Sequence, residues 1–357
     1  MVERKNKGEW SEFYVLLKLL ADGKIFNADK NVRKMSNIFF PIIKIIREEK
    51  GKQIDYNINS SNGDVEIYYN MQPVKVIKNE QMQRMATYIY NEILRGNYRA
   101  FGIEDAEKIM TIMECTKVAA SSTDKTDINM IIHDTYTGIE QKCGFSIKSE
   151  LGSAPTLLNA SGATNFVFEV QGLNYLDMVR INNINTSTKI LDRIKAICDI
   201  GKMNFVKAKN ENFSANLRLI DSYMETIIAE MLIFYYRDNY GDCSAAVNVL
   251  EEINPLGYPR RGFYEYKFKK FLCSIALGMM PSKPWSGLDE ANGGYIIVKQ
   301  DGDVLAYHLY NRNAFEEYLL KNTKFDRGST TKNGFAVVYQ ETDGRMYINL
   351  NLQIRFK

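Results

Sequence analysis

Two lysines between residues 126 and 153 each end a short pattern that suits metal-assisted phosphodiester hydrolysis. Lys142 closes the triplet EQK at 140–142, and Lys148 closes the triplet SIK at 146–148. Asp127 precedes both triplets. An aspartate supplies a hard oxygen ligand for Mg²⁺, and a lysine can hold or help deprotonate the attacking water. The sequence therefore raises the question of which lysine lies beside Asp127.

These residues fall in a predicted β-hairpin over residues 126–151. A β-branched run is followed by the turn-rich segment DTYTG at 134–138 and by a second alternating run. If Asp134 pairs with Ile139 across the turn, Asp127 lies opposite Ser146. Lys148 then lies two residues further along the same face. We therefore predict that Asp127 and Lys148 meet.

Period-two alternation divides the second strand of this hairpin between a polar face and a core-facing one. The polar set is Ser146, Lys148 and Glu150, and the core-facing set is Phe145, Ile147 and Leu151. Where a second carboxylate is usual, the sequence has Ser146, which is a poor metal ligand at neutral pH. Glu150 and the main-chain carbonyl of Ile147 are the candidate second ligands.

The EQK triplet fails the same pairing test. On this register Glu140 and Lys142 oppose His133 and Ile131, and Asp127 lies several residues away along the first strand. We interpret the EQK match as coincidental. For the pair formed by Asp127 and Lys148, the alternative interpretation is a solvated ion pair on the sheet surface.

Composition excludes several other kinds of chemistry. The chain has two histidines, so a three-histidine zinc site is excluded, and its five cysteines include no Cys-x-x-Cys pair. No phosphate-binding Gly-x-x-x-x-Gly-Lys loop is present. With 46 basic and 43 acidic residues, any basic surface must be local. The absence of a signal-like N-terminus or a long apolar run leads us to expect a soluble protein of the reducing cytoplasm with no membrane partner.

The elements that must position the hairpin can be read from local patterns. Helical spacing with a glycine stop predicts a helix over 9–24, and a second helix is predicted over 79–96. Strands are predicted over 37–49, 64–70 and 165–172. Residues 187–280 are mostly helical in pattern, and a Pro/Gly-rich stretch at 281–294 marks a boundary. Beyond it, hairpin signals at 301–302 and 343–344 indicate an α+β module.

Three segments resemble the HpaII family of type II restriction endonucleases, which cut double-stranded DNA at CCGG. They are GFSIKSELGSAPTLLNASGATNFVFEV at 144–170, KGEWSEFYVLLKLLADGKIF at 7–26 and NLQIRF at 351–356. The resemblance implies an α+β fold with a PD-(D/E)xK nuclease core, a mixed sheet flanked by helices. We expect this core and its helical elaborations over residues 1–280, and a DNA-contacting α+β module over residues 281–357.

The resemblance also implies a set of functional residues and partners. Asp127 matches the first acid of the motif, although Thr126 stands where the signature has proline, and Lys148 matches the lysine. Ser146 departs from the usual acid, which leaves the second metal ligand open. Glu12 resembles the glutamate of the N-terminal helix that approaches the metal site, with a solvated helix residue as the alternative. Mg²⁺, double-stranded DNA, a homodimer at least on DNA and the cytoplasm of a prokaryote are implied as well.

Two polar segments are candidate DNA contacts. The first has few charges but many small hydrogen-bonding groups, which can grip phosphates: Ser153, Asn159, Ser161, Thr164 and Asn165. Its alternative interpretation is an ordinary capped loop. In the second, arginine can read guanine and a carboxylate can accept from cytosine; it comprises Asp326, Arg327, Ser329, Thr330, Thr331 and Lys332.

Two rival functions remain open from the sequence. One is a structure-selective repair or recombination nuclease that uses the same core without reading bases. The other is a DNA-binding protein whose catalytic site has decayed, an interpretation that Ser146 at the position of the usual acid makes conceivable.

Overall fold

The structure is a computed structural model that describes residues 3–29, 31–49, 51–97, 99–119, 126–307 and 311–357. Chain contacts divide it into two compact units. Unit 1 comprises residues 1–155 and 290–315, and unit 2 comprises residues 156–289 and 316–357. Within the described residues, every helix is too short or too polar to cross a lipid bilayer. Both units combine helices with sheets, so the α+β class predicted from the sequence is confirmed.

Unit 1 is built on a mixed sheet whose strand order, among the described residues, is β1-β12-β11-β7-β6-β2-β3-β4-β5. A further pairing joins β1 to β2. The strands are β1 (Lys24–Ala28), β2 (Lys34–Glu49), β3 (Lys52–Ile58), β4 (Val65–Tyr69), β5 (Gln72–Ile77), β6 (Ile128–His133), β7 (Glu140–Ser149), β11 (Gly294–Val298) and β12 (Val304–Tyr307).

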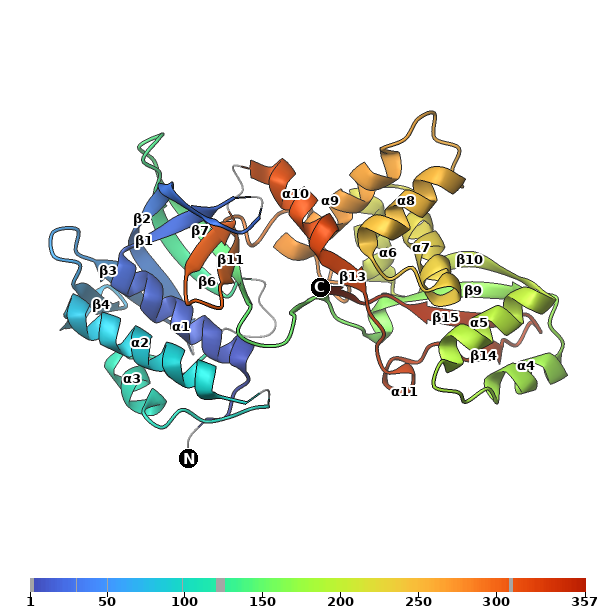
Figure 1. Cartoon of the computed structure of the whole chain (residues 1–357), viewed down its shortest axis with the longest axis horizontal. Coiled ribbons are helices and arrows are strands. Elements are labelled where there is room, and N and C mark those ends of the chain that lie inside the picture. The colour runs from blue at the N-terminus through green and yellow to red at the C-terminus, as the bar shows by residue number, and fades with distance from the viewer. Residues whose placement is uncertain (1–2, 30, 50, 98, 120–125, 308–310) are drawn as a thin grey trace. The chain divides into compact units, whose positions relative to one another are not determined.

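Among the described residues of unit 1, the helices that share the buried core of the sheet are α1 (Lys7–Asp22), α2 (Asn79–Arg95) and α3 (Ala106–Ile112). α1 and α2 lie side by side against the sheet and share one buried core with its strands (Figure 1). α1 begins with a capping box between Asn6 and Glu9 and ends at Gly23, whose φ of 65° is left-handed. The predicted helix with its glycine stop is therefore confirmed, and so are the predicted strands that became β2 and β4.

Unit 2 holds two smaller sheets and a group of helices. One sheet has the order β10-β9-β15-β14 and the other β13-β16-β8. The strands are β8 (Thr156–Leu158), β9 (Asn165–Gln171), β10 (Lys202–Ala208), β13 (Thr323–Phe325), β14 (Val338–Gln340), β15 (Met346–Asn351) and β16 (Ile354–Phe356). The helices are α4 (Tyr175–Asn182), α5 (Lys189–Ile200), α6 (Glu211–Ile220), α7 (Met224–Asp238), α8 (Cys243–Ile253), α9 (Phe263–Leu277) and α11 (Thr330–Asn333). α10 (Arg312–Asn322) contains the point at which the chain passes from unit 1 to unit 2.

The two units do not coincide with the division at residues 280 and 281 that the sequence suggested. The chain does pass between units within the Pro/Gly-rich stretch, at residues 289 and 290. Residues 290–315 then return to unit 1, because β11 forms parallel pairs with β7 and antiparallel pairs with β12. The pairing of β11 with β7 joins strands that are about 150 residues apart in sequence. Local periodicity does not predict such a pairing.

Candidate active site

The hairpin of β6 and β7 has the register predicted from the sequence. Ile128 pairs with Phe145 at one end and His133 with Glu140 at the other. At the turn, the Asp134 amide donates to the Ile139 carbonyl at 2.9 Å. The hairpin therefore brings the residue before β6, Asp127, alongside the last part of β7.

Asp127 and Lys148 are joined through the hydroxyl of Ser146. The Ser146 Oγ donates to the Asp127 carboxylate at 3.1 Å and accepts from the Lys148 Nζ at 2.9 Å. The same Asp127 oxygen, Oδ2, accepts from the Ile147 amide at 2.6 Å. Ser146 is buried. Ser146 thus connects the two groups that the sequence predicted to meet.

The alternation predicted along β7 holds from Phe145 to Lys148 but not at Glu150, because the strand ends at Ser149. Phe145, Ile147 and Leu151 belong to the buried core shared with α1 and α2, and Ser146 and Lys148 do not. Lys148 is partly exposed, but its ammonium is buried. This burial lowers the pKa of Lys148, and the negative charges of Asp127 and Glu12, which act to raise the pKa, offset only part of the effect. The ammonium is held close to carboxylates in a region of reduced solvation.

Glu12 reaches this region from α1. One residue before it, the Ser11 hydroxyl lies 2.7 Å from the Ser149 hydroxyl at the end of β7, which fixes the helix against the strand. Glu12 and Asp127 line the same small cavity of about 20 Å³, together with Arg47 from β2. Glu12 is partly buried, so the alternative of a fully solvated helix residue does not describe it.

Glu150 lies elsewhere. It follows the end of β7 and is exposed, and its Oε1 lies 2.8 Å from the Lys299 Nζ. Its amide donates to the Val298 carbonyl at 2.9 Å, and the side chain does not line the cavity beside Asp127. The structure therefore brings together Asp127, Ser146, Lys148 and Glu12, and it pairs Glu150 with a surface lysine instead.

A larger cavity of about 310 Å³ opens beside Asp127. Its wall includes Arg47, Lys117 and Lys142 in addition to Asp127. Lys142 opposes Ile131 as predicted and is exposed, yet it also reaches this cavity. The EQK triplet therefore does not pair with Asp127, but its lysine contributes positive charge near it.

The donor set beside Asp127 suits a hard divalent cation. Within the described ranges of the chain, no three His, Cys, Asp or Glu side chains are grouped closely enough to form a metal cluster on their own. The two carboxylates that share the small cavity, those of Asp127 and Glu12, are nevertheless the oxygen ligands that Mg²⁺ prefers. Mg²⁺ usually keeps several waters and takes only one or two protein carboxylates, so this pair fits it.

Two residues near the site were missed by the sequence reasoning. Arg47 lines both cavities at Asp127, and its Nε donates to Glu49 at 2.5 Å. Tyr295 lies on β11, opposite Ser146, with its ring facing the Lys148 ammonium. The continuous apolar run YIIV at 295–298 is typical of a buried strand, but no local signal tells which strand it pairs with.

The two candidate DNA-contacting segments meet within unit 2. The Asn351 amide donates to the Ser161 carbonyl at 2.8 Å and to the Asn165 side chain at 2.7 Å. The Asn165 amide in turn donates to the Asn333 carbonyl at 2.8 Å. Thr164 and Asn165 are buried and hold the segments together. The segments around 156–165 and 326–334 therefore form one polar region of unit 2, whereas Ser153 belongs to unit 1.

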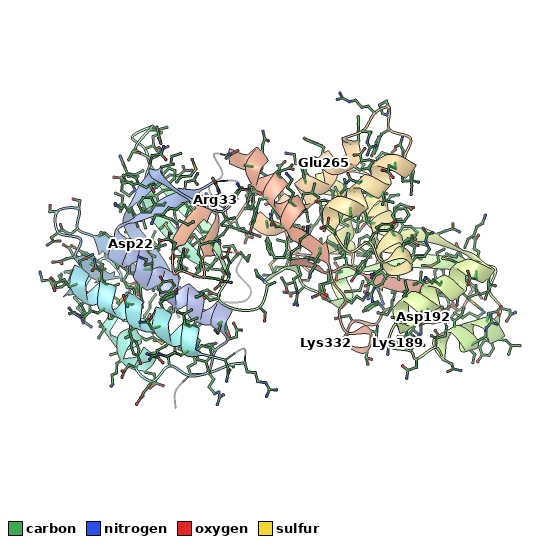
Figure 2. All side chains as sticks on the ribbon, in the orientation of Figure 1. Asp22, Arg33, Lys189, Asp192, Glu265 and Lys332 are labelled. Atoms are coloured by element: carbon green, nitrogen blue, oxygen red, sulfur yellow. The ribbon has the colours of Figure 1, made fainter. Side chains whose placement is uncertain are left out.

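Other members of these segments are accessible. The exposed ones are Ser153, Asn159, Ser329, Thr331 and Lys332, the last on α11 (Figure 2). Ser161, Thr330, Asp326 and Arg327 are partly exposed. Asp326 pairs with Arg355 at 3.1 Å, and the Arg327 guanidinium lies 5.3 Å from the Tyr235 ring centroid while donating to Asn239 at 2.8 Å.

Comparisons with known proteins agree with the resemblance. The family described as HpaII restriction endonuclease matches residues 6–356. The type II restriction enzyme HpaII of Haemophilus parainfluenzae is 41% identical over 357 residues, which cover 98% of this chain and 98% of that enzyme. No solved structure gives a significant match.

Proposed function

Because the chain belongs to the HpaII restriction endonuclease family, we propose that it hydrolyses double-stranded DNA at CCGG with Mg²⁺ as its cofactor. Its enzyme class follows from the family, so the chain is a type II site-specific deoxyribonuclease of a restriction-modification system. The chemistry is supported by one observation, the hydrogen-bonded series Asp127–Ser146–Lys148. The proposed core is of the PD-(D/E)xK type.

In this proposal Asp127 and Glu12 hold the divalent ion, and the carbonyl of Ile147 is a further candidate ligand. The ion, when bound, withdraws charge from the phosphoryl oxygens and makes water a better nucleophile. Asp127 is oriented by the Ile147 amide, so its carboxylate is fixed before DNA binds. Lys148 positions the attacking water and assists its deprotonation, and Ser146 orients the ammonium.

Glu12 is proposed as the second carboxylate in preference to Glu150. Glu12 shares a cavity with Asp127 and its charge acts on Lys148. Glu150 is exposed and paired with Lys299. Ser146 remains in the site as a hydrogen-bonding residue and not as a ligand.

DNA contacts are proposed for the polar region of unit 2. We assign phosphate contacts to the accessible Ser153, which lies in unit 1, and to Asn159, Ser161, Ser329, Thr330, Thr331 and Lys332. Arg327 reads guanine or contacts phosphate, and Asp326 accepts from cytosine. Thr164 and Asn165 support these loops from within. A palindromic target has two equivalent scissile bonds, so the proposed assembly on DNA is a two-fold symmetric homodimer in the prokaryotic cytoplasm.

Digestion of plasmid DNA with Mg²⁺, followed by sequencing of the ends, tests this function. Discrete fragments whose ends all derive from CCGG support it. Cuts that follow branches or mismatches would favour the structure-selective repair or recombination nuclease. A protein that binds duplex DNA but leaves it intact with every divalent ion would favour a decayed site.

A further inference from the structure

The Lys148 ammonium has an aromatic ring as a neighbour in addition to the Ser146 hydroxyl. β11 runs parallel to β7, with Tyr295 opposite Ser146 and Ile297 opposite Lys148. The Lys148 Nζ lies 5.1 Å from the centroid of the Tyr295 ring. A cation within about 6 Å of a ring centroid is attracted by the negative face of the ring.

The ring is held firmly in place. Tyr295 is 1% exposed, and the Phe315 ring packs edge-on against it, with centroids 5.1 Å apart and planes at 82°. The chain before it approaches β7 closely, because a Cβ at Gly293 would lie 2.5 Å from the Phe145 ring. Gly294 has a φ of 90°, which side-chain-bearing residues rarely adopt. Two glycines therefore allow β11 to present Tyr295 to the site.

We propose that Tyr295 is a positioning residue for DNA cleavage, whose ring face holds the Lys148 ammonium beside the Ser146 hydroxyl. The inference rests on the proposed role of Lys148. With serine in place of the usual acid, the amine lacks an adjacent carboxylate on its own strand, and its hydrogen-bonding partner on β7 is neutral. The ring adds an attraction that is directional and that is strengthened by burial. The ring thereby limits the positions that the amine can take beside the Ser146 hydroxyl.

The test varies the electrostatics of the ring at nearly constant shape. Phenylalanine and its mono-, di- and trifluorinated analogues are introduced at position 295, and single-turnover cleavage of a CCGG duplex is measured with Mg²⁺. All of these variants lack the hydroxyl, so their comparison isolates the ring face. We expect Tyr295→Phe to stay within about threefold of the wild-type rate, and cleavage to fall stepwise with fluorination to a total of about tenfold. Duplex binding with Ca²⁺ should not change.

Controls separate positioning from stability. Lys52 lies 5.0 Å from the ring centroid of Tyr69 at another part of the same sheet, so Tyr69→Leu removes a matched contact and should leave cleavage within about twofold. Thermal unfolding of every variant is recorded. A flat cleavage rate across the fluorinated series would overturn the inference.

One further variant distinguishes the inference from the proposed function. If Lys148→Met abolishes cleavage while the fluorinated series is flat, Tyr295 is not a positioning residue and the proposed role of Lys148 stands. If Lys148→Met cleaves at the wild-type rate, the proposed role of Lys148 itself is wrong.

Discussion

Removal of the Ser146 hydroxyl tests whether the serine couples the acid to the amine. In Ser146→Ala the Asp127 carboxylate loses a donor at 3.1 Å and the Lys148 ammonium loses an acceptor at 2.9 Å. The Ile147 amide still donates to Asp127, so the aspartate should keep its place better than the lysine.

The magnitude follows from the charges of the two partners. A hydrogen bond to a charged group contributes roughly 1.5–3 kcal/mol. About 1.36 kcal/mol added to the activation free energy lowers a rate tenfold. If the transition state loses the stabilisation of one such hydrogen bond, the cleavage rate should therefore fall about 10- to 150-fold. Since serine and alanine differ by one buried oxygen, the fold should persist.

Single-turnover cleavage of a CCGG duplex with Mg²⁺ is the assay, with duplex binding in Ca²⁺ measured in parallel. Ser274→Ala is the matched control, because Ser274 is also a buried serine and its hydroxyl donates to the Lys270 carbonyl of its own helix, at 2.9 Å. A cleavage rate for Ser146→Ala within twofold of the control variant would refute the coupling role.

Two other predictions concern carboxylates. Glu12→Gln should lower the cleavage rate by about 100-fold or more, because a negatively charged metal ligand is lost, whereas Glu150→Gln should stay within about threefold of the wild-type rate. Cleavage rates are measured as a function of Mg²⁺ concentration, and equal losses of rate in the two variants would contradict this assignment. Burial opposes ionisation of Glu49, but hydrogen bonds from Thr116 and the charge of Arg47 outweigh it and lower the pKa of Glu49. Its stabilisation is therefore present above the unfolded-state pKa and is lost as the pH falls through the lower folded-state pKa. Glu49→Gln should lower the free energy of unfolding, measured with urea, by about 1–3 kcal/mol at pH 7 and by progressively less in acid. A loss of unfolding free energy that does not depend on pH would contradict this reasoning.

The hairpin that carries the site could be predicted because its determinants are local. A turn-rich segment, two alternating runs and a core-facing set fix one register, in which Asp127 falls beside Ser146. α1 was predictable for the same reason, from its apolar spacing and Gly23. Local periodicity therefore sufficed to bring Asp127 and Lys148 together.

The residue proposed as the second carboxylate could not be identified from local periodicity, although the family resemblance pointed to Glu12. Glu150 was expected to continue the polar face of β7, but the strand ends at Ser149 and the chain turns, so that Glu150 points to Lys299. Glu12 approaches instead from α1, whose contact with β7 depends on tertiary packing. Tyr295 depends on a parallel pairing of distant strands, which periodicity does not specify.

The polar segments show a similar limit. Small hydroxyl and amide side chains serve equally well at a DNA surface and in a buried network. Thr164 and Asn165 are buried, and their side chains accept hydrogen bonds from the Asn351 amide. Ser329 and Lys332, in contrast, are exposed. Sequence identified the segments but not which of their members face outward.

The most direct test of the account is the structure of the protein bound to a CCGG duplex with Ca²⁺ in place of Mg²⁺. We predict a Ca²⁺ ion bound by the carboxylates of Asp127 and Glu12, with the scissile phosphate beside it and the Lys148 ammonium directed at the attacking side of that phosphate. An ion bound by other residues, or a scissile phosphate held away from Asp127 and Lys148, would contradict the account.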